Sequence, residues 1–154
     1  MNLSPSRISC TWPHVLARKR FCRGLPFTGI SDVFVYLQTL IADYEYKVFS
    51  MIFLDSRHRS IAYRRLFTGT IDQVTVPPRE IIKAALEHNA AAVILVHNHP
   101  SGDPEPSECD FGLTDELSSA LNLVGIRTLD HIIVATEGCV SLAERGYFKS
   151  LSTG

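Results

Sequence analysis

The chain has 154 residues, of which 45 % are hydrophobic and 20 % are charged, and these proportions are ordinary for a soluble globular protein. No apolar run approaches the ~20 residues that a membrane-spanning helix needs. Residues 1–25 contain five Lys or Arg and no Asp or Glu, which leaves a net charge of −6 on the remainder. Because an acidic domain repels phosphate groups, we do not expect it to bind nucleic acid itself. Any contact with nucleic acid would need the basic N-terminal segment or a larger complex.

The N-terminal segment, residues 1–27, contains three prolines and shows no steady periodicity, so we interpret it as a basic, poorly ordered extension. Residues 28–152 then form a single domain. Prolines and arginines interrupt any apolar signal region at the N-terminus, and we expect a cytoplasmic protein. The four cysteines include no Cys-x-x-Cys pair, so free thiols are expected rather than a disulfide framework.

In the first half of the domain, the pattern predicts a helix from Ser31, acting as its cap, to about Asp43. Two strands follow at residues 46–54 and 60–66, separated by the polar turn 55–59. A short strand is predicted at residues 74–76.

In the second half, Pro77 and Pro78 introduce a helix that ends near Asn89. Its expected apolar face consists of Ile81, Ile82, Ala85 and Leu86. A buried strand at residues 91–96, a helix at 107–123 and an apolar strand at 126–134 complete the order. The order of elements predicts a mixed α/β fold.

The strongest functional pattern follows the strand at residues 91–96. His97 and His99 are one residue apart, and side chains in a strand repeat with period two, so both imidazoles can reach one ion. Ser107 and Asp110 form the Ser-x-x-Asp spacing of a helix start, and this turn carries Asp110 back toward the histidines. Three protein ligands with a fourth position left for water are typical of a catalytic zinc site.

The same residues also allow a purely structural interpretation, in which Ser107 caps a helix and Asp110 complements its dipole. Cys109 is expected to be a small residue of the first helical turn and not a nucleophile. The deaminase signature, which needs His-x-Glu and Pro-Cys-x-x-Cys, is absent, as is the His-Glu-x-x-His pattern of helical zinc proteases.

The spacing His-x-His, seven residues, then Ser-x-x-Asp resembles that of the JAMM or MPN metallopeptidases, and within them the RadC-like proteins. The resemblance covers roughly residues 28–149. It is carried by Leu66-Phe67-Thr68-Gly69-Thr70, Pro78-Arg79-Glu80, Asn89-Ala90-Ala91, His97-Asn98-His99-Pro100-Ser101-Gly102, Asp130-His131 and Ser141-Leu142-Ala143-Glu144-Arg145-Gly146.

This resemblance implies a JAMM/MPN-like mixed β-sheet flanked by helices, with the overall layout of the cytidine deaminases. It also implies a Zn²⁺ ion held by His97, His99 and Asp110, and hydrolysis of an amide or isopeptide bond in a peptide or protein substrate. Ser107 matches a serine that stabilises the oxyanion in the family.

The family's general acid/base is a glutamate at the start of the strand after the first helix, and the ungapped match in this chain is Lys47. Three interpretations are open. Glu45, which would share a strand face with Lys47, is ranked first. A domain that binds zinc but hydrolyses poorly is ranked second, and substitution by Glu80 third.

Two further expectations concern residues outside the ligand set. Asp130 and His131 are interpreted as a polar pair that bonds neighbouring backbone, with orientation of a ligand histidine as the alternative. The rival to an enzyme is a non-enzymatic RadC-like module associated with DNA repair or recombination. Lys47 favours this rival, whereas the complete ligand set favours the enzyme.

Overall fold

The computed structural model describes residues 30–71 and 73–149, so the predicted extension at residues 1–27 lies outside the described part. The elements in chain order are α3 (Ile30–Ile41), β1 (Val48–Leu54), β2 (Ser60–Thr68), α4 (Pro78–Glu87), β3 (Ala92–Asn98), α5 (Glu108–Leu123), β4 (Arg127–Ala135), β5 (Gly138–Ser141) and η2 (Tyr147–Lys149). The strands form one sheet in the order β2-β1-β3-β4-β5. Among the strands that the structure describes, only β3 and β4 pair in parallel, which confirms the predicted mixed α/β fold.

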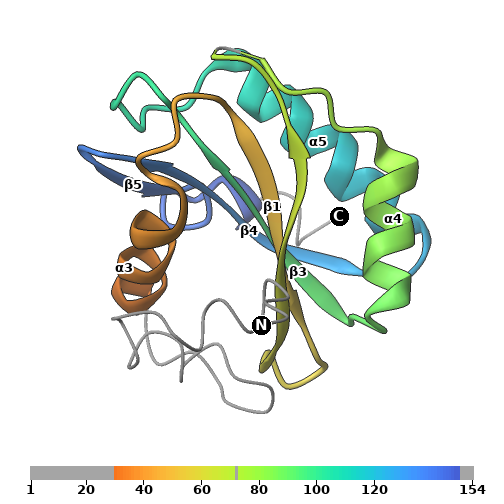
Figure 1. The fold of residues 1–154 in the computed structure, drawn as a ribbon. Coiled ribbons are helices and arrows are strands. Elements are labelled where there is room, and N and C mark those ends of the chain that lie inside the picture. The colour runs from red at the N-terminus through yellow and green to blue at the C-terminus, as the bar shows by residue number, and fades with distance from the viewer. Residues whose placement is uncertain (1–29, 72, 150–154) are drawn as a thin grey trace, which may run out of the picture.

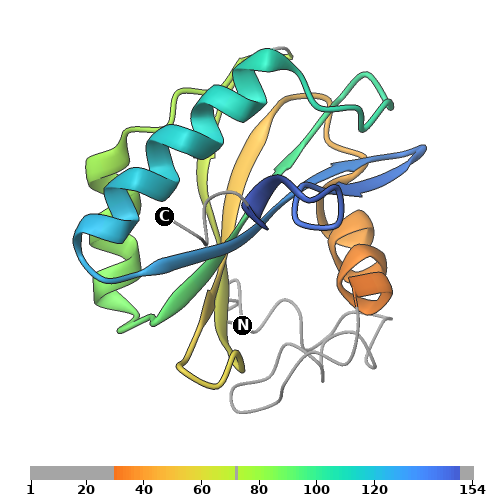
Figure 2. The ribbon, with the colours of Figure 1, turned by 180° about the vertical axis from the view of Figure 1, so that it is seen from behind.

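Helices cover both faces of the sheet, with α3 on one side and α4 and α5 on the other (Figures 1 and 2). The alternation of side chains along β1 and β3 assigns each residue to a face. Even-numbered residues pack with α3, among them Ile52, Leu54, Ile94 and Val96. Odd-numbered residues pack with α4 and α5, among them Phe49, Met51, Phe53, Val93 and Leu95. Every odd-numbered residue in this part of β1 and β3 therefore faces α4 and α5.

Two predictions about the elements that precede α4 are wrong. Helix α3 already includes Ile30, so Ser31 lies inside its first turn and is not the residue before it. Residues 74–76 form no strand, and no residue of this segment appears in a strand pair. Val76 is buried and Val74 is partly buried against the core beneath α4, so their apolar alternation reflects packing of an irregular segment.

The helix after the proline pair begins as predicted, with Pro77 preceding Pro78 at the first helical position. Its buried face consists of Ile81 and Ala85, whereas Leu86 is 55 % exposed, so the predicted apolar face was one residue too wide. Strand β5 was not predicted; it pairs antiparallel with β4 and closes one edge of the sheet. Among the described residues, no helix combines the length and apolarity that crossing a bilayer requires.

Candidate metal centre

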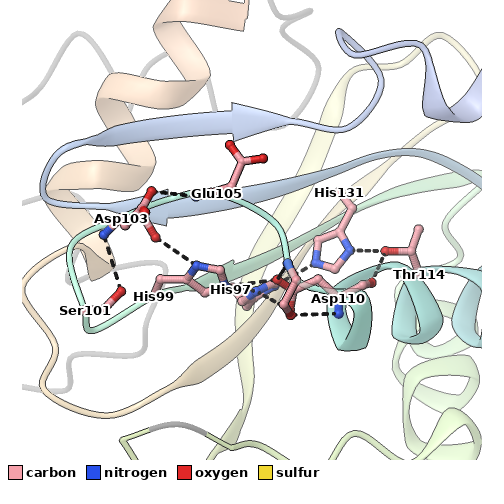
Figure 3. A network of polar contacts seen from close by, with 9 residues as sticks. His97, His99, Ser101, Asp103, Glu105, Asp110, Thr114 and His131 are labelled. Carbon is pink, nitrogen blue, oxygen red and sulfur yellow. Dashed lines mark hydrogen bonds and ion pairs between the residues drawn. The ribbon is translucent and has the colours of Figure 1, made fainter.

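The three predicted ligands lie together where β3 ends and α5 begins (Figure 3). His97 Nε2 lies 3.1 Å from His99 Nε2 and 3.1 Å from Asp110 Oδ1. His99 Nε2 lies 3.1 Å from Asp110 Oδ2. All three side chains are buried, and one ligand atom from each lies within 4.8 Å of the others. His97 lies in β3, an inner strand paired with β1 and β4, and His99 is the first residue after it, so both histidines lie at the centre of the sheet edge.

The helix start that carries Asp110 is fixed by a reciprocal pair of hydrogen bonds. The Asp110 N–H donates to Ser107 Oγ at 3.3 Å, and the Ser107 N–H donates to Asp110 Oδ2 at 2.8 Å. This is the capping box that the Ser-x-x-Asp spacing predicts. Two orphan amides of the helix end are thereby satisfied, and the Asp110 carboxylate is held toward the histidines.

The loop that follows His99 determines which nitrogen of its ring carries the proton. Its Nδ1 lies 3.0 Å from the Asp103 carbonyl oxygen. A carbonyl oxygen can only accept, so Nδ1 must be the donor, and a neutral His99 then carries a lone pair on Nε2. That lone pair faces a carboxylate oxygen of Asp110, which is also an acceptor. A cation between the two atoms satisfies both, and either a proton or a metal ion can supply it.

His97 is supported by a chain of buried polar groups behind it (Figure 3). Its Nδ1 lies 2.8 Å from His131 Nε2 on β4, and His131 Nδ1 lies 2.5 Å from Thr114 Oγ1 on α5. Thr114 Oγ1 in turn donates to the backbone carbonyl of Asp110 at 2.7 Å. The chain therefore begins at one predicted ligand and ends at the backbone of another.

A metal ion on His97 Nε2 would determine which atom donates and which accepts in each of these hydrogen bonds. His97 Nδ1–H then donates to His131 Nε2, His131 Nδ1–H donates to Thr114, and the Thr114 hydroxyl donates to the carbonyl, so no group is left unpaired. Burial lowers the pKa of His97 and lowers that of His131 well below its usual value. Neutral imidazoles are the forms that this arrangement requires.

The Asp110 carboxylate stays ionised at this site. Burial alone would raise its pKa, but in the metal-free site a proton on Nε2 of His97 or His99 donates to the carboxylate, and with the Ser107 N–H these hydrogen bonds outweigh burial and hold the pKa well below its usual range. Two imidazole nitrogens and one carboxylate oxygen are a donor set typical of zinc in hydrolytic enzymes. The residues present therefore fit a divalent metal ion.

The other predicted site residues occupy different positions. The exposed Ser107 uses its oxygen as an acceptor for the Asp110 N–H, which leaves its hydroxyl proton to be donated outward. Glu45 is exposed in the segment between α3 and β1, and among the described residues it makes no hydrogen bond or ion pair with His97, His99 or Asp110. Glu80 is exposed on the first turn of α4.

Asp130 bonds neighbouring backbone as predicted, whereas the ring of His131 does not. The Asp130 carboxylate accepts from the His131 N–H at 2.7 Å, the Ala143 N–H at 2.9 Å and the Ser141 hydroxyl at 2.5 Å. It thus ties β4 to the residues around the end of β5. The His131 ring instead contacts the ligand His97, so the orienting role that was the alternative describes it better.

Thr114 and Asn98 were not singled out by the sequence. Thr114 lies four residues after Asp110, one helical turn along the same face of α5, which is the signal that its position offered. Asn98 stands between the two histidines, and its amide donates to the Tyr46 carbonyl at 3.0 Å and accepts from the Val48 N–H at 2.7 Å. No local sequence pattern predicts the contacts of Asn98, because they join residues 50 or more positions apart.

Comparison with known proteins places these features in a family. Residues 27–147 match the model of the RadC-like JAB domain. A UPF0758 protein of Vibrio cholerae is 48 % identical over 132 residues, which cover 86 % of this chain and 83 % of the relative. A UPF0758 protein of Xanthomonas campestris is 52 % identical over 125 residues, covering 81 % of this chain and 56 % of the relative.

A further relative, a UPF0758 protein of Marinomonas, is 49 % identical over 129 residues, which cover 84 % of this chain and 58 % of the relative. The chain thus spans little more than half of the Xanthomonas and Marinomonas proteins and most of the Vibrio one. The match of the family model and the identities to these relatives agree. The chain belongs to the RadC-like JAB domain family, a relative of the MPN domains.

Proposed function

We propose that this domain is a metal-dependent hydrolase that cleaves an amide or isopeptide bond in a peptide or protein, with Zn²⁺ as its metal. The observation that carries the proposal is the arrangement around His99. Its Nδ1 is committed to a carbonyl, so its Nε2 lone pair and the Asp110 carboxylate face each other across 3.1 Å with His97 beside them. A divalent cation satisfies all three groups at once.

When bound, the ion supplies a Lewis acid that polarises a carbonyl group and makes a water molecule acidic. The chain's own residues do the rest. His97, His99 and Asp110 fix the ion on a rigid strand end and a capped helix start. The outward Ser107 hydroxyl donates to the oxyanion that forms when water attacks the carbonyl. Glu45 remains our candidate for moving the proton, as a carboxylate two residues from Lys47.

The first test is the metal content of protein purified without chelator. We expect about one zinc ion per chain in the wild type and none in His97→Ala or Asp110→Ala. Asp103→Asn is the matched control, because it removes an exposed carboxylate from the same loop and leaves the carbonyl that holds His99. Elemental analysis that finds no zinc in the wild type, even after zinc is added back, would overturn the proposal.

The second test is hydrolysis of a fluorogenic peptide library by the zinc-loaded protein. Glu45→Gln is expected to lower kcat about 100-fold, the usual effect of losing a general acid/base. Glu80→Gln, which changes an exposed carboxylate on α4, should have no effect. A large loss in Glu80→Gln and none in Glu45→Gln would exchange the two roles.

A metal-binding domain without hydrolytic activity is the second candidate, because Lys47 and not a carboxylate immediately precedes β1, the strand that pairs with β3. It predicts stoichiometric zinc without turnover of any peptide. If this domain acts on DNA, it should be retained on a DNA column in a salt-dependent way. If hydrolysis is its function, the acidic domain should not be retained.

A further inference from the structure

Lys47 lies on the side of the sheet that carries the metal ligands. Phe49 pairs with His97 across β1 and β3, and its ring packs edge-on against His131 with the centroids 6.3 Å apart. The backbone of Lys47 continues this extended segment: its N–H donates to the Thr70 carbonyl at 2.7 Å and its carbonyl accepts from the Gly69 N–H at 2.8 Å. Because side chains two residues apart in an extended chain share a face, Lys47 continues the row beside the ligands.

The segment around Lys47 is also fastened to the ligand strand itself. Asn98 stands between His97 and His99 in the sequence, and its fully buried amide bonds to the backbone on either side of Lys47, at Tyr46 and Val48. These side-chain bonds join β1 and β3 where their backbone pairing ends at Phe49 and His97. The position of Lys47 relative to the two histidines is therefore fixed by the fold.

In the described part of the chain, no acidic side chain neutralises the charge of Lys47. Its side chain is half-buried, and within residues 30–71 and 73–149 no Asp or Glu forms an ion pair with it. Lys47 lies two residues before Phe49, the residue that pairs with His97, so its charge lies near the candidate ligands. A divalent ion, one Asp110 carboxylate and one ammonium group sum to a net positive site.

We propose that Lys47 is a specificity-determining residue that binds a carboxylate of the substrate next to the bond to be cleaved. This assignment rests on the proposed function, since it takes the metal ion to be present. The carboxylate can belong to an acidic side chain or to the C-terminus of a peptide, and both present the same group to the ammonium ion. Lysine suits this task because its single charge, on a flexible stem, accepts carboxylates in many orientations.

The test uses three probes of the same size and the zinc-loaded chain. N-acetylglutamine amide is neutral, N-acetylglutamate α-amide carries only a side-chain carboxylate, and N-acetylglutamine carries only an α-carboxylate. Dissociation constants are measured by NMR titration for the wild type, Lys47→Gln and Lys47→Arg. We expect the wild type to prefer one charged probe over the neutral one, and the identity of that probe shows which source of carboxylate is recognised.

In Lys47→Gln that preference should fall about fivefold, as expected for losing one partly exposed charge pair, whereas Lys47→Arg should keep it. Zinc content is measured on the same samples. With zinc bound, an unchanged preference in Lys47→Gln, or no preference in the wild type, would overturn the role of Lys47 and leave the proposed function standing. Absence of zinc from the wild type would overturn both.

Discussion

The Nδ1 atom of His97 lies 2.8 Å from the Nε2 atom of His131, and this contact joins β3 to the neighbouring strand β4, 34 residues further along the chain. A ligand imidazole that binds metal through Nε2 must carry its proton on Nδ1, and His131 is placed to accept that proton in a hydrogen bond. Thr114 in turn holds His131. The orientation of one candidate ligand is thus set by two residues outside the candidate ligand set.

Loss of His131 should therefore weaken metal binding. We expect His131→Ala to lower zinc affinity by about tenfold to 100-fold, the usual cost of removing a partner of a ligand histidine. Thr114→Val should act in the same direction and Thr114→Ser, which keeps the hydroxyl, should not. The measurement is competition with a chelator of known affinity. Equal affinities in Thr114→Val and the wild type, with a lower melting temperature in the variant, would reduce Thr114 to a packing role.

Metal should also stabilise the fold, because the complete ligand set exists only in the folded chain. At a free zinc concentration 100 times the Kd, the free energy of unfolding should rise by about 2.7 kcal/mol. Urea denaturation with and without chelator measures this difference. Asp110→Asn should abolish it while keeping an acceptor for the Ser107 N–H, and Asp103→Asn should retain it in full. A zinc effect that persists in Asp110→Asn would place the ion elsewhere.

Ser107 is expected to have two separable roles. Ser107→Ala removes the helix cap and should cost about 1 kcal/mol of stability. It should also lower kcat about 100-fold, because a donor to the oxyanion is lost. Ser107→Thr keeps the hydroxyl for both purposes and is the control. Earlier unfolding of Ser107→Ala with full turnover would leave the cap as the only role.

The two cysteines in the described part of the chain should differ in reactivity. Burial raises the pKa of the Cys139 thiol to about 11, whereas Cys109 is exposed on the first turn of α5. At pH 8 only ~0.1 % of Cys139 is then the reactive thiolate, and its alkylation rate should rise about tenfold per pH unit until pH approaches 11. Iodoacetamide labelling followed by peptide mapping tests this. Rapid labelling of Cys139 at pH 8 would show that the strand edge at β5 opens.

The local part of the site could be predicted because its patterns are short. The spacing of His97 and His99 follows from strand periodicity, and that of Ser107 and Asp110 from the capping box. The contacts of His131 and Asn98 could not be predicted in this way. They depend on which strands are neighbours and in which register, and those pairings are settled by packing of the whole sheet.

The fold shows the same division between local and distant causes. The apolar stretch that became β3 and the helix started by Ser107 were predicted because burial and capping leave clear local marks. Strand β5 has four residues and exists through its pairing with β4, so its own sequence carries little signal. At residues 74–76 the local pattern predicted a strand that does not form. Its alternating apolar side chains pack against the core without a partner strand.

The hydrogen bonds of Asn98 hold the backbone around position 47 without involving the side chain at that position. Its amide holds the backbone at Tyr46 and Val48, so exchanging the side chain between them need not shift either histidine. Within a family that shares this framework, a single codon change at position 47 can then reverse the charge beside the candidate metal centre without moving its ligands. Substrate preference can diverge along such lineages without any redesign of the metal centre.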